Sequence, residues 1–135
     1  MAHILLVDDD EFVRAGLAAV LAGAGHMTAE ASSIMAAETV LAEAGDEFDI
    51  VLLDLWLPDG SGLGLLDRLM ASRPHLPVVV MSGGGPGRSL EQALAVADAT
   101  GAAATIIKPF QNAELIEAVE AVLQKRSQVQ DADDD

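Results

Sequence analysis

The chain has 135 residues, of which 51% are hydrophobic and 3% aromatic, and it carries a formal net charge of −15. This length fits one domain, and the negative charge disfavours nucleic acid and anionic membranes as direct partners. Cations and basic protein surfaces fit better. The chain has no cysteine, which excludes disulfides and thiolate metal sites. Its apolar runs are shorter than a membrane span and no leader-like segment opens it, so we expect a cytoplasmic location.

Five short apolar runs predict β-strands, and several lack polar alternation, as is typical of strands buried on both faces. These runs are Ile4–Val7, Met27–Ala31, Ile50–Leu53, Val78–Met81 and Ala103–Ile107. Between and after them, apolar residues at helical spacing predict five helices. The helical stretches are Val13–Leu21, the weaker Ser33–Ala44, Leu63–Met70, Leu90–Ala97 and Leu115–Val122. This alternation predicts an α/β domain with a doubly wound, five-stranded parallel sheet.

Two segments depart from this pattern. SGGGPGRS, residues 82–89, is rich in glycine, and we expect it to form a mobile loop. Residues 127–135, SQVQDADDD, are polar and acidic and have no periodicity, so we expect a frayed or disordered tail after a domain that covers residues 1–126. The three histidines, His3, His26 and His75, are scattered, and we interpret them as surface or turn residues.

Polar side chains follow four of the predicted strands. Asp8 and Asp9 follow the first strand, Asp54 the third, Ser82 the fourth and Lys108 the fifth. In open parallel sheets, ligands bind beyond the carboxyl ends of the strands, so we expect these side chains to form one site. Carboxylate oxygens are the ligands that Mg²⁺ prefers, and a carboxylate shielded by the ion can attack phosphorus.

Each of these residues also has a purely structural interpretation. Asp54 can cap a helix, although Pro58 and the glycines after it place it early for that role. Ser82 can be a turn residue. Lys108 can form an ordinary internal ion pair, because an ammonium at the end of an apolar run needs an anionic partner. Asp10 and Glu11 are expected to begin the first helix, where acids favour the helix dipole.

Several short motifs, taken together and in this order, resemble the receiver domain of two-component response regulators, in particular the chemotaxis-type single-domain regulators. The motifs are VDD at 7–9, DLWLP at 54–58, Gly62, MSG at 81–83 and KPF at 108–110. The resemblance covers residues 2 to about 125. It implies a flavodoxin-like strand order, 2-1-3-4-5, and a signalling module rather than an enzyme proper, with self-catalysed phosphorylation and dephosphorylation.

The resemblance also implies a role for each residue of the site. Asp54 is the phosphoacceptor, Asp8, Asp9, Asp54 and the backbone carbonyl of Trp56 hold Mg²⁺, and Ser82 and Lys108 contact the phosphoryl oxygens. The donor is a sensor histidine kinase or a histidine phosphotransfer protein. The output is a switched face that binds a downstream protein target, with no direct contact to nucleic acid or membrane.

One position departs from the family. Receivers commonly carry an aromatic residue three positions before the lysine, as a switch coupled to the hydroxyl residue, whereas this chain has Thr105. Two other functions stay open. An aspartate-nucleophile phosphohydrolase of the haloacid dehalogenase type usually has a second acid two positions after the nucleophile, where Trp56 stands here. A pseudo-receiver would act as a docking surface without phosphorylation. The chain is either a stand-alone receiver or a fragment of a longer regulator.

Overall fold

The computed structural model describes residues 1–44, 46–83 and 90–133. In chain order the elements are β1 (His3–Val7), α1 (Glu11–Gly23), β2 (Met27–Ala31), α2 (Ile34–Ala44), β3 (Ile50–Asp54), β4 (Trp56–Leu57), β5 (Gly60–Ser61), α3 (Gly62–Ser72), β6 (Val78–Ser82), α4 (Leu90–Thr100), β7 (Ala104–Ile107) and α5 (Asn112–Asp133). Most of the glycine-rich stretch that we expected to form a mobile loop, residues 84–89, lies outside the described residues.

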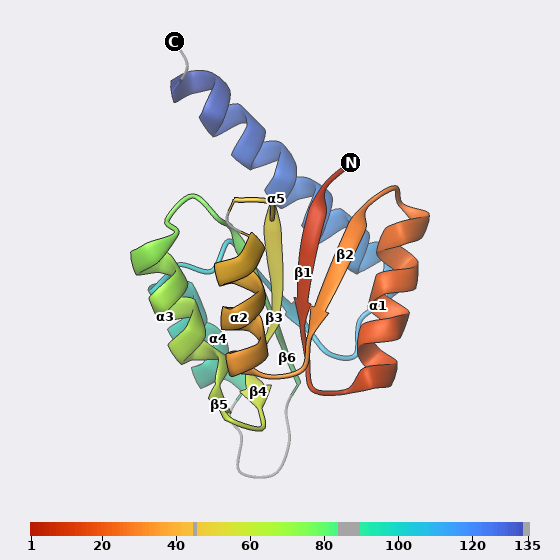
Figure 1. Ribbon diagram of the computed structural model, residues 1–135, viewed down its shortest axis with the longest axis vertical. Helices are drawn as coiled ribbons and strands as arrows, with labels where there is room; N and C mark the ends of the chain where they lie inside the picture. Colours follow the sequence, from red (N-terminus) through yellow and green to blue (C-terminus); the bar gives the residue numbers. More distant parts are fainter. Residues whose placement is uncertain (45, 84–89, 134–135) are drawn as a thin grey trace.

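Five strands form one parallel sheet in the order β2-β1-β3-β6-β7 (Figure 1). The predicted doubly wound sheet and its order 2-1-3-4-5 are therefore confirmed, since β6 and β7 are the fourth and fifth strands of this sheet. Every residue of β3 and β6 is buried, because helices cover both faces of the sheet. The order reverses at β1 and β3, and ligands bind at such a point in open parallel sheets.

Alternate residues of each central strand enter two separate aliphatic cores. Leu5 and Val7 of β1 pack towards α2, α3 and α4, whereas Ile4 and Leu6 pack towards α1 and α5. Figure 1 shows α2, α3 and α4 together on one side of the sheet. Full burial of one such side chain contributes about 1.5–3 kcal/mol. The site residues at the strand ends are therefore carried by the most deeply packed part of the molecule.

The turn after β3 forms a small hairpin. Pro58 and the glycines indicated a long turn between Asp54 and the next helix, and within it β4 and β5 form a small antiparallel ladder that pairs Trp56 with Ser61 and Leu57 with Gly60. Gly60 has a φ of +147°, a conformation that favours glycine. The hairpin returns the chain to the end of β3, where α3 begins at once.

The predicted tail also differs from the structure. Helix α5 continues across residue 126 to Asp133, so most of the segment expected to be frayed or disordered is helical. This segment has no glycine or proline to stop a helix, and extending an existing helix avoids the cost of nucleation. Figure 1 shows α5 projecting beyond the sheet on the side where both termini lie. Among the described helices, none is both long and apolar enough to cross a membrane.

His26 lies in the connection between α1 and β2, as a turn residue would, but its side chain is more buried than we expected. Its side chain is only 6% exposed, and its Nε2 lies 2.8 Å from Oε1 of Glu120 on α5. Its Nδ1 accepts a hydrogen bond of 3.1 Å from the amide of Ala2. These partners are distant in the sequence, which is why local patterns do not predict the burial. His26 links the turn before β2 to α5.

We expect Gly62→Ala to destabilise the domain by roughly 1–3 kcal/mol, because the new methyl group has no room. A Cβ at position 62 would meet the Asp54 carbonyl oxygen and lie 2.9 Å from Leu55 Cα. Gly64→Ala in the same helix is the matched control, because its nearest neighbour, Arg68 Nη1, lies 3.6 Å away. The control should be neutral or stabilise by up to about 1 kcal/mol. Urea unfolding measures both, and equal stabilities of the two variants would contradict the close packing.

Candidate functional site

The acidic run after β1 divides between two structures. Asp8 is buried and its Oδ1 accepts a hydrogen bond of 2.9 Å from the Asp10 amide. Asp10 is the N-cap of α1, and its Oδ1 accepts hydrogen bonds from the amides of Phe12 (2.9 Å) and Val13 (3.2 Å). The expectation that Asp10 begins the helix is confirmed. Asp8 and the exposed Asp9 remain at the end of the strand.

Arg14 holds the loop between β1 and α1, and we did not predict this role. Its Nη1 donates a hydrogen bond of 2.6 Å to the backbone carbonyl of Asp8. Its Nε donates to Glu30 Oε1 of β2 over 3.2 Å. The guanidinium of Arg14 thus fixes the loop that carries Asp8 and Asp9. An arginine one helical turn after an acidic run is the only sequence signal for this contact.

Asp54 ends β3 and is buried. Its Oδ1 accepts a hydrogen bond of 3.3 Å from the amide of Trp56. The hairpin that follows is anchored by Asp59, whose carboxylate accepts hydrogen bonds from the first amides of α2, Ile34 (2.9 Å) and Met35 (3.1 Å). These bonds lower the pKa of Asp59 below its ordinary value. The backbone carbonyl expected to hold a metal therefore belongs to a tethered hairpin.

The ends of β6 and β7 bring a hydroxyl and an ammonium to the same edge. Lys108 Nζ lies 2.8 Å from Asp8 Oδ2 and 3.4 Å from Asp54 Oδ2. Its backbone amide donates a hydrogen bond of 2.8 Å to the carbonyl of Ser82, and its peptide bond to Pro109 is cis. The Ser82 hydroxyl is buried and has no hydrogen-bond partner among the described residues. A buried polar atom of this kind is costly unless a ligand pairs with it.

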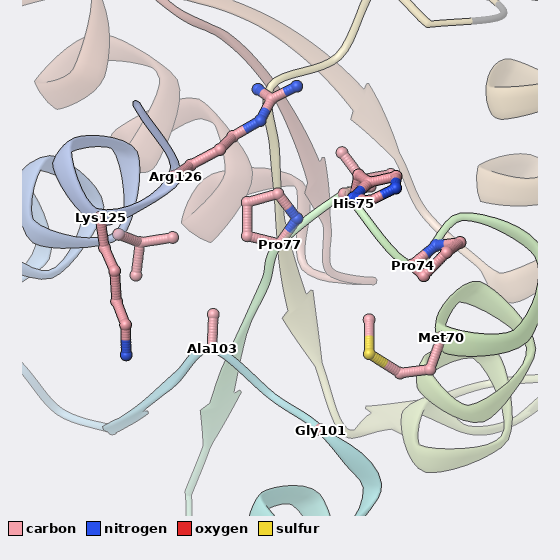
Figure 2. A pocket seen from close by; sticks show the side chains of 10 residues that line it. Met70, Pro74, His75, Pro77, Gly101, Ala103, Lys125 and Arg126 are labelled. Atoms are coloured by element: carbon pink, nitrogen blue, oxygen red, sulfur yellow. The ribbon is translucent and has the colours of Figure 1, made fainter. Parts of the chain in front are cut away.

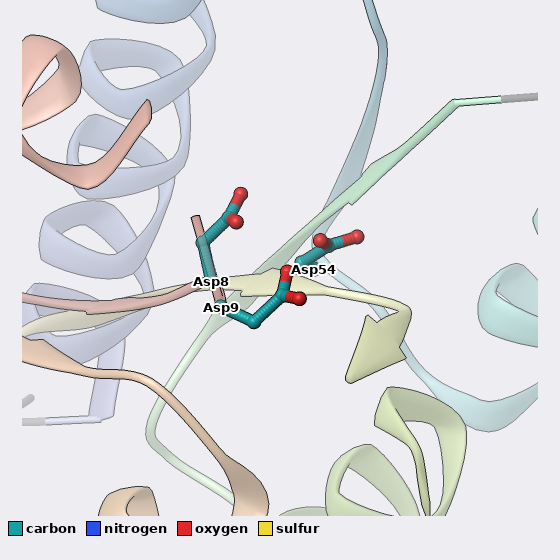
Figure 3. A group of neighbouring side chains, drawn as sticks. All are labelled: Asp8, Asp9 and Asp54. Carbon is teal, nitrogen blue, oxygen red and sulfur yellow. The ribbon is translucent and has the colours of Figure 1, made fainter. Parts of the chain in front are cut away.

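The three aspartates converge from two strands (Figure 3). One carboxylate oxygen from each of Asp8, Asp9 and Asp54 lies within 4.8 Å of the others. Mg²⁺ holds oxygen ligands at about 2.0–2.1 Å, so ligands on opposite sides of the ion lie about 4 Å apart. Neighbouring ligands lie about 2.9 Å apart, so small side-chain adjustments would bring these three oxygens into octahedral positions with at most one opposite pair. The donor set, all oxygen and mostly carboxylate, fits a hard divalent cation.

Comparison with known proteins identifies the family. The family model for the response regulator receiver domain matches residues 4–120. The chain belongs to this family. The swarming motility regulation protein RssB of Serratia marcescens is 37% identical over 120 residues, which are 89% of this chain and 52% of RssB. The response regulator protein FleR of Pseudomonas aeruginosa is 35% identical over 119 residues, which are 87% of this chain but 24% of FleR.

Solved structures agree with this assignment. This chain superposes on a crystal structure of NtrX from Brucella abortus in complex with ATP, with a TM-score of 0.88 and 33% sequence identity. The match covers 98% of this chain and 29% of that NtrX chain. This chain therefore spans about half the length of RssB and less than a third of FleR and of NtrX.

The receiver domain collects most of the predicted site residues at one edge. Asp8, Asp9, Asp54 and Lys108 lie together, and Ser82 ends the strand between those of Asp54 and Lys108. Thr105 does not join them. It is exposed on β7, two residues before Ile107, which is the register partner of Ser82.

Burial dominates the electrostatics of Asp54 and raises its pKa above the ordinary value. The charge of Asp8 raises this pKa further. The charge of Lys108 and the hydrogen bond from the Trp56 amide lower it, but they do not reverse the shift. Burial lowers the pKa of Lys108, yet its bonds to Asp8 and Asp54 outweigh this and leave the pKa raised. The receiver domain therefore keeps a firmly protonated ammonium beside a carboxylate that is costly to ionise.

We expect Asp54→Asn to stabilise the domain at pH 7 in buffer without divalent metal. Because the folded-state pKa of Asp54 lies above 3.8, the protonated acid favours folding below pH 3.8, and this contribution is lost as the pH rises through the folded pKa. The variant avoids that loss. Its advantage over the wild type in urea unfolding should shrink as the pH falls from 7 towards 3.8. A variant that is less stable at pH 7 would contradict the pKa shift.

Proposed function

We propose that this receiver domain accepts a phosphoryl group on Asp54 from a sensor histidine kinase or a histidine phosphotransfer protein, in a reaction that depends on Mg²⁺. The observation that carries the proposal is the shared ion pair. The Lys108 ammonium contacts Asp8 and Asp54 at once. The buried hydroxyl of Ser82, at the end of the neighbouring strand, has no partner in the part of the chain that the structure describes. Two buried acids, one ammonium and one free donor suit a group that arrives with its own negative oxygens.

Phosphoryl transfer assigns a task to each residue. A carboxylate oxygen of Asp54 attacks phosphorus, the phosphorus–nitrogen bond of the donor breaks, and the imidazole leaves with the electron pair and takes up a proton. Lys108 and Ser82 receive the phosphoryl oxygens. Asp8, Asp9, Asp54 and the Trp56 carbonyl would hold Mg²⁺, which would supply positive charge to offset the acids and the phosphoryl group. Later attack by water on phosphorus releases phosphate and restores the Asp54 carboxylate.

The ion pair also supports a route from the site to an output surface. A phosphoryl group on Asp54 competes with Asp8 for Lys108, and it offers Ser82 the acceptor it lacks. Both residues border β7, where Ile107 is 49% exposed, and Val96 of the neighbouring α4 is 47% exposed. We infer that the face of α4, β7 and α5 binds a downstream protein. Thr105, exposed on that face, takes part in the switch without the aromatic coupling common in the family.

The proposed role is signalling in the cytoplasm rather than metabolism. Self-catalysed phosphorylation and dephosphorylation serve the switch, and neither nucleic acid nor a membrane is a proposed partner of this domain. The phosphohydrolase alternative is less well supported, because the half-buried Trp56 stands where the second acid would be. The shared ion pair likewise favours phosphorylation over a receiver that only docks.

Incubation with Mg²⁺ and acetyl phosphate, followed by intact-mass spectrometry, tests the proposal. We expect the mass of one phosphoryl group on the wild type, lost on Asp54→Asn, on Asp9→Asn and on removal of Mg²⁺. Glu11→Gln is the matched control. It removes a neighbouring carboxylate that the site does not use, so the mass gain should persist, with a stability loss of a few tenths to about 1 kcal/mol.

Two results would contradict the proposal. Rapid multiple turnovers on a generic phosphomonoester, abolished by Asp54→Asn, would identify a phosphohydrolase. No mass gain from acetyl phosphate or from a phosphorylated histidine phosphotransfer protein would leave only a docking role.

A further inference from the structure

A cavity of about 340 Å³ lies at the edge of the sheet opposite the proposed phosphorylation site. Pro77 and Ala103, which line it, come directly before β6 and β7. The opposite ends of these two strands carry Ser82 and Lys108. We call this space the base cavity. Its volume falls within the range of small-molecule sites, about 300–1,000 Å³.

The walls of the base cavity are mostly apolar. Met70 of α3 and Pro77 contribute side chains, and Gly101 after α4 contributes backbone (Figure 2). Val122 of α5 also lines the cavity. Gly101 has a φ of +115°, and a Cβ there would lie 2.9 Å from Met70 Sδ. The wall therefore depends on a glycine at a close approach of backbone and side chain. A small apolar ligand can contact a thioether, a proline ring and an aliphatic side chain here.

The charged groups that line the base cavity, Lys125 and Arg126, are both positive. His75 also lines it, and no acid among the described residues does, although the chain has 22 Asp and Glu residues. Lys125 has no hydrogen-bond or ion-pair partner in the part of the chain that the structure describes. Arg126 donates from Nη1 to the carbonyl (3.0 Å) and Oδ1 (2.9 Å) of Asp49, and its buried Nε has no partner among the described residues.

We propose that the base cavity binds an amphipathic monocarboxylate, with its apolar body against Met70, Pro77 and Val122 and its carboxylate at Lys125. A cationic ligand finds no acid in the lining. A phosphate ester needs more donors than one free ammonium and an arginine already paired with Asp49. A single carboxylate needs only the one free ammonium that Lys125 offers. Because the whole chain is strongly negative, anions are repelled elsewhere, so a local cationic rim gives selectivity for this site.

This inference goes beyond the proposed function and does not depend on it. None of the residues that line the base cavity belongs to the acid cluster or contacts it. Binding to the base cavity can therefore be tested on Asp54→Ala as well as on the wild type. Failure at one site leaves the other untouched.

Octanoate is a suitable probe, with octanol as the neutral ligand of equal chain length. Amide ¹H–¹⁵N spectra at pH 7 should show saturable shifts that centre on Gly101 and Ala103, and octanol should bind clearly more weakly. Lys125→Glu should raise the Kd for octanoate roughly tenfold. Arg68→Glu is the control, because it makes the same charge change on an exposed arginine of α3 outside the cavity. Ala103→Leu should also weaken binding by filling the cavity.

Thermal unfolding of each variant establishes that it is folded before binding is compared. The proposal is overturned if octanoate gives no saturable shifts. It is equally overturned if octanol binds as well as octanoate, or if Lys125→Glu and Arg68→Glu change the Kd by the same factor.

Discussion

Two buried carboxylates, Asp8 and Asp54, share the single ammonium of Lys108 at the edge where β1, β3 and β7 end. Two like charges about 4 Å apart repel by roughly 4 kcal/mol at an effective dielectric constant of 20, so the acids cannot stay close and ionised without this cation. Lys108 is 100 residues from Asp8 and 54 from Asp54. The charge balance therefore exists only when the last strand has joined the sheet, and it couples the site to the completed fold.

One ammonium does not balance the negative charge of this edge, and the proposed chemistry depends on the remaining charge. Asp9 adds a third carboxylate beside one ammonium, so the charge at this edge favours the divalent cation that we propose. In the proposed reaction, a bound cation allows an anionic phosphoryl group to approach Asp54. The Ser82 hydroxyl, which has no partner among the described residues, then gains an acceptor. In this proposal, the bound cation favours binding of the phosphoryl group, and the phosphoryl group favours the hydrogen bond from Ser82. Arg14 and Asp59 hold the loops that follow Asp8 and Asp54.

Local patterns in the sequence were sufficient for the parallel sheet and for the residues at its carboxyl edge, because buried strands are marked by neighbouring apolar residues. The strand order came from the resemblance to receiver domains. They were insufficient where distant residues decide. Arg14 meets Glu30 over 16 positions, Asp59 meets Ile34 over 25, and His26 meets Glu120 over 94. The length of α5 was also missed, since polar composition alone does not end a helix that is already formed.

The fluorescence of Trp56, the only tryptophan of the chain, tests the central claim most directly, because its amide contacts Asp54. The emission is followed while Mg²⁺ and then beryllium fluoride, a phosphoryl mimic, are added. The account predicts a saturable change with each addition for the wild type, and no response to beryllium fluoride for Asp54→Ala. A wild type that is silent to both additions, or a variant that responds like the wild type, would contradict it.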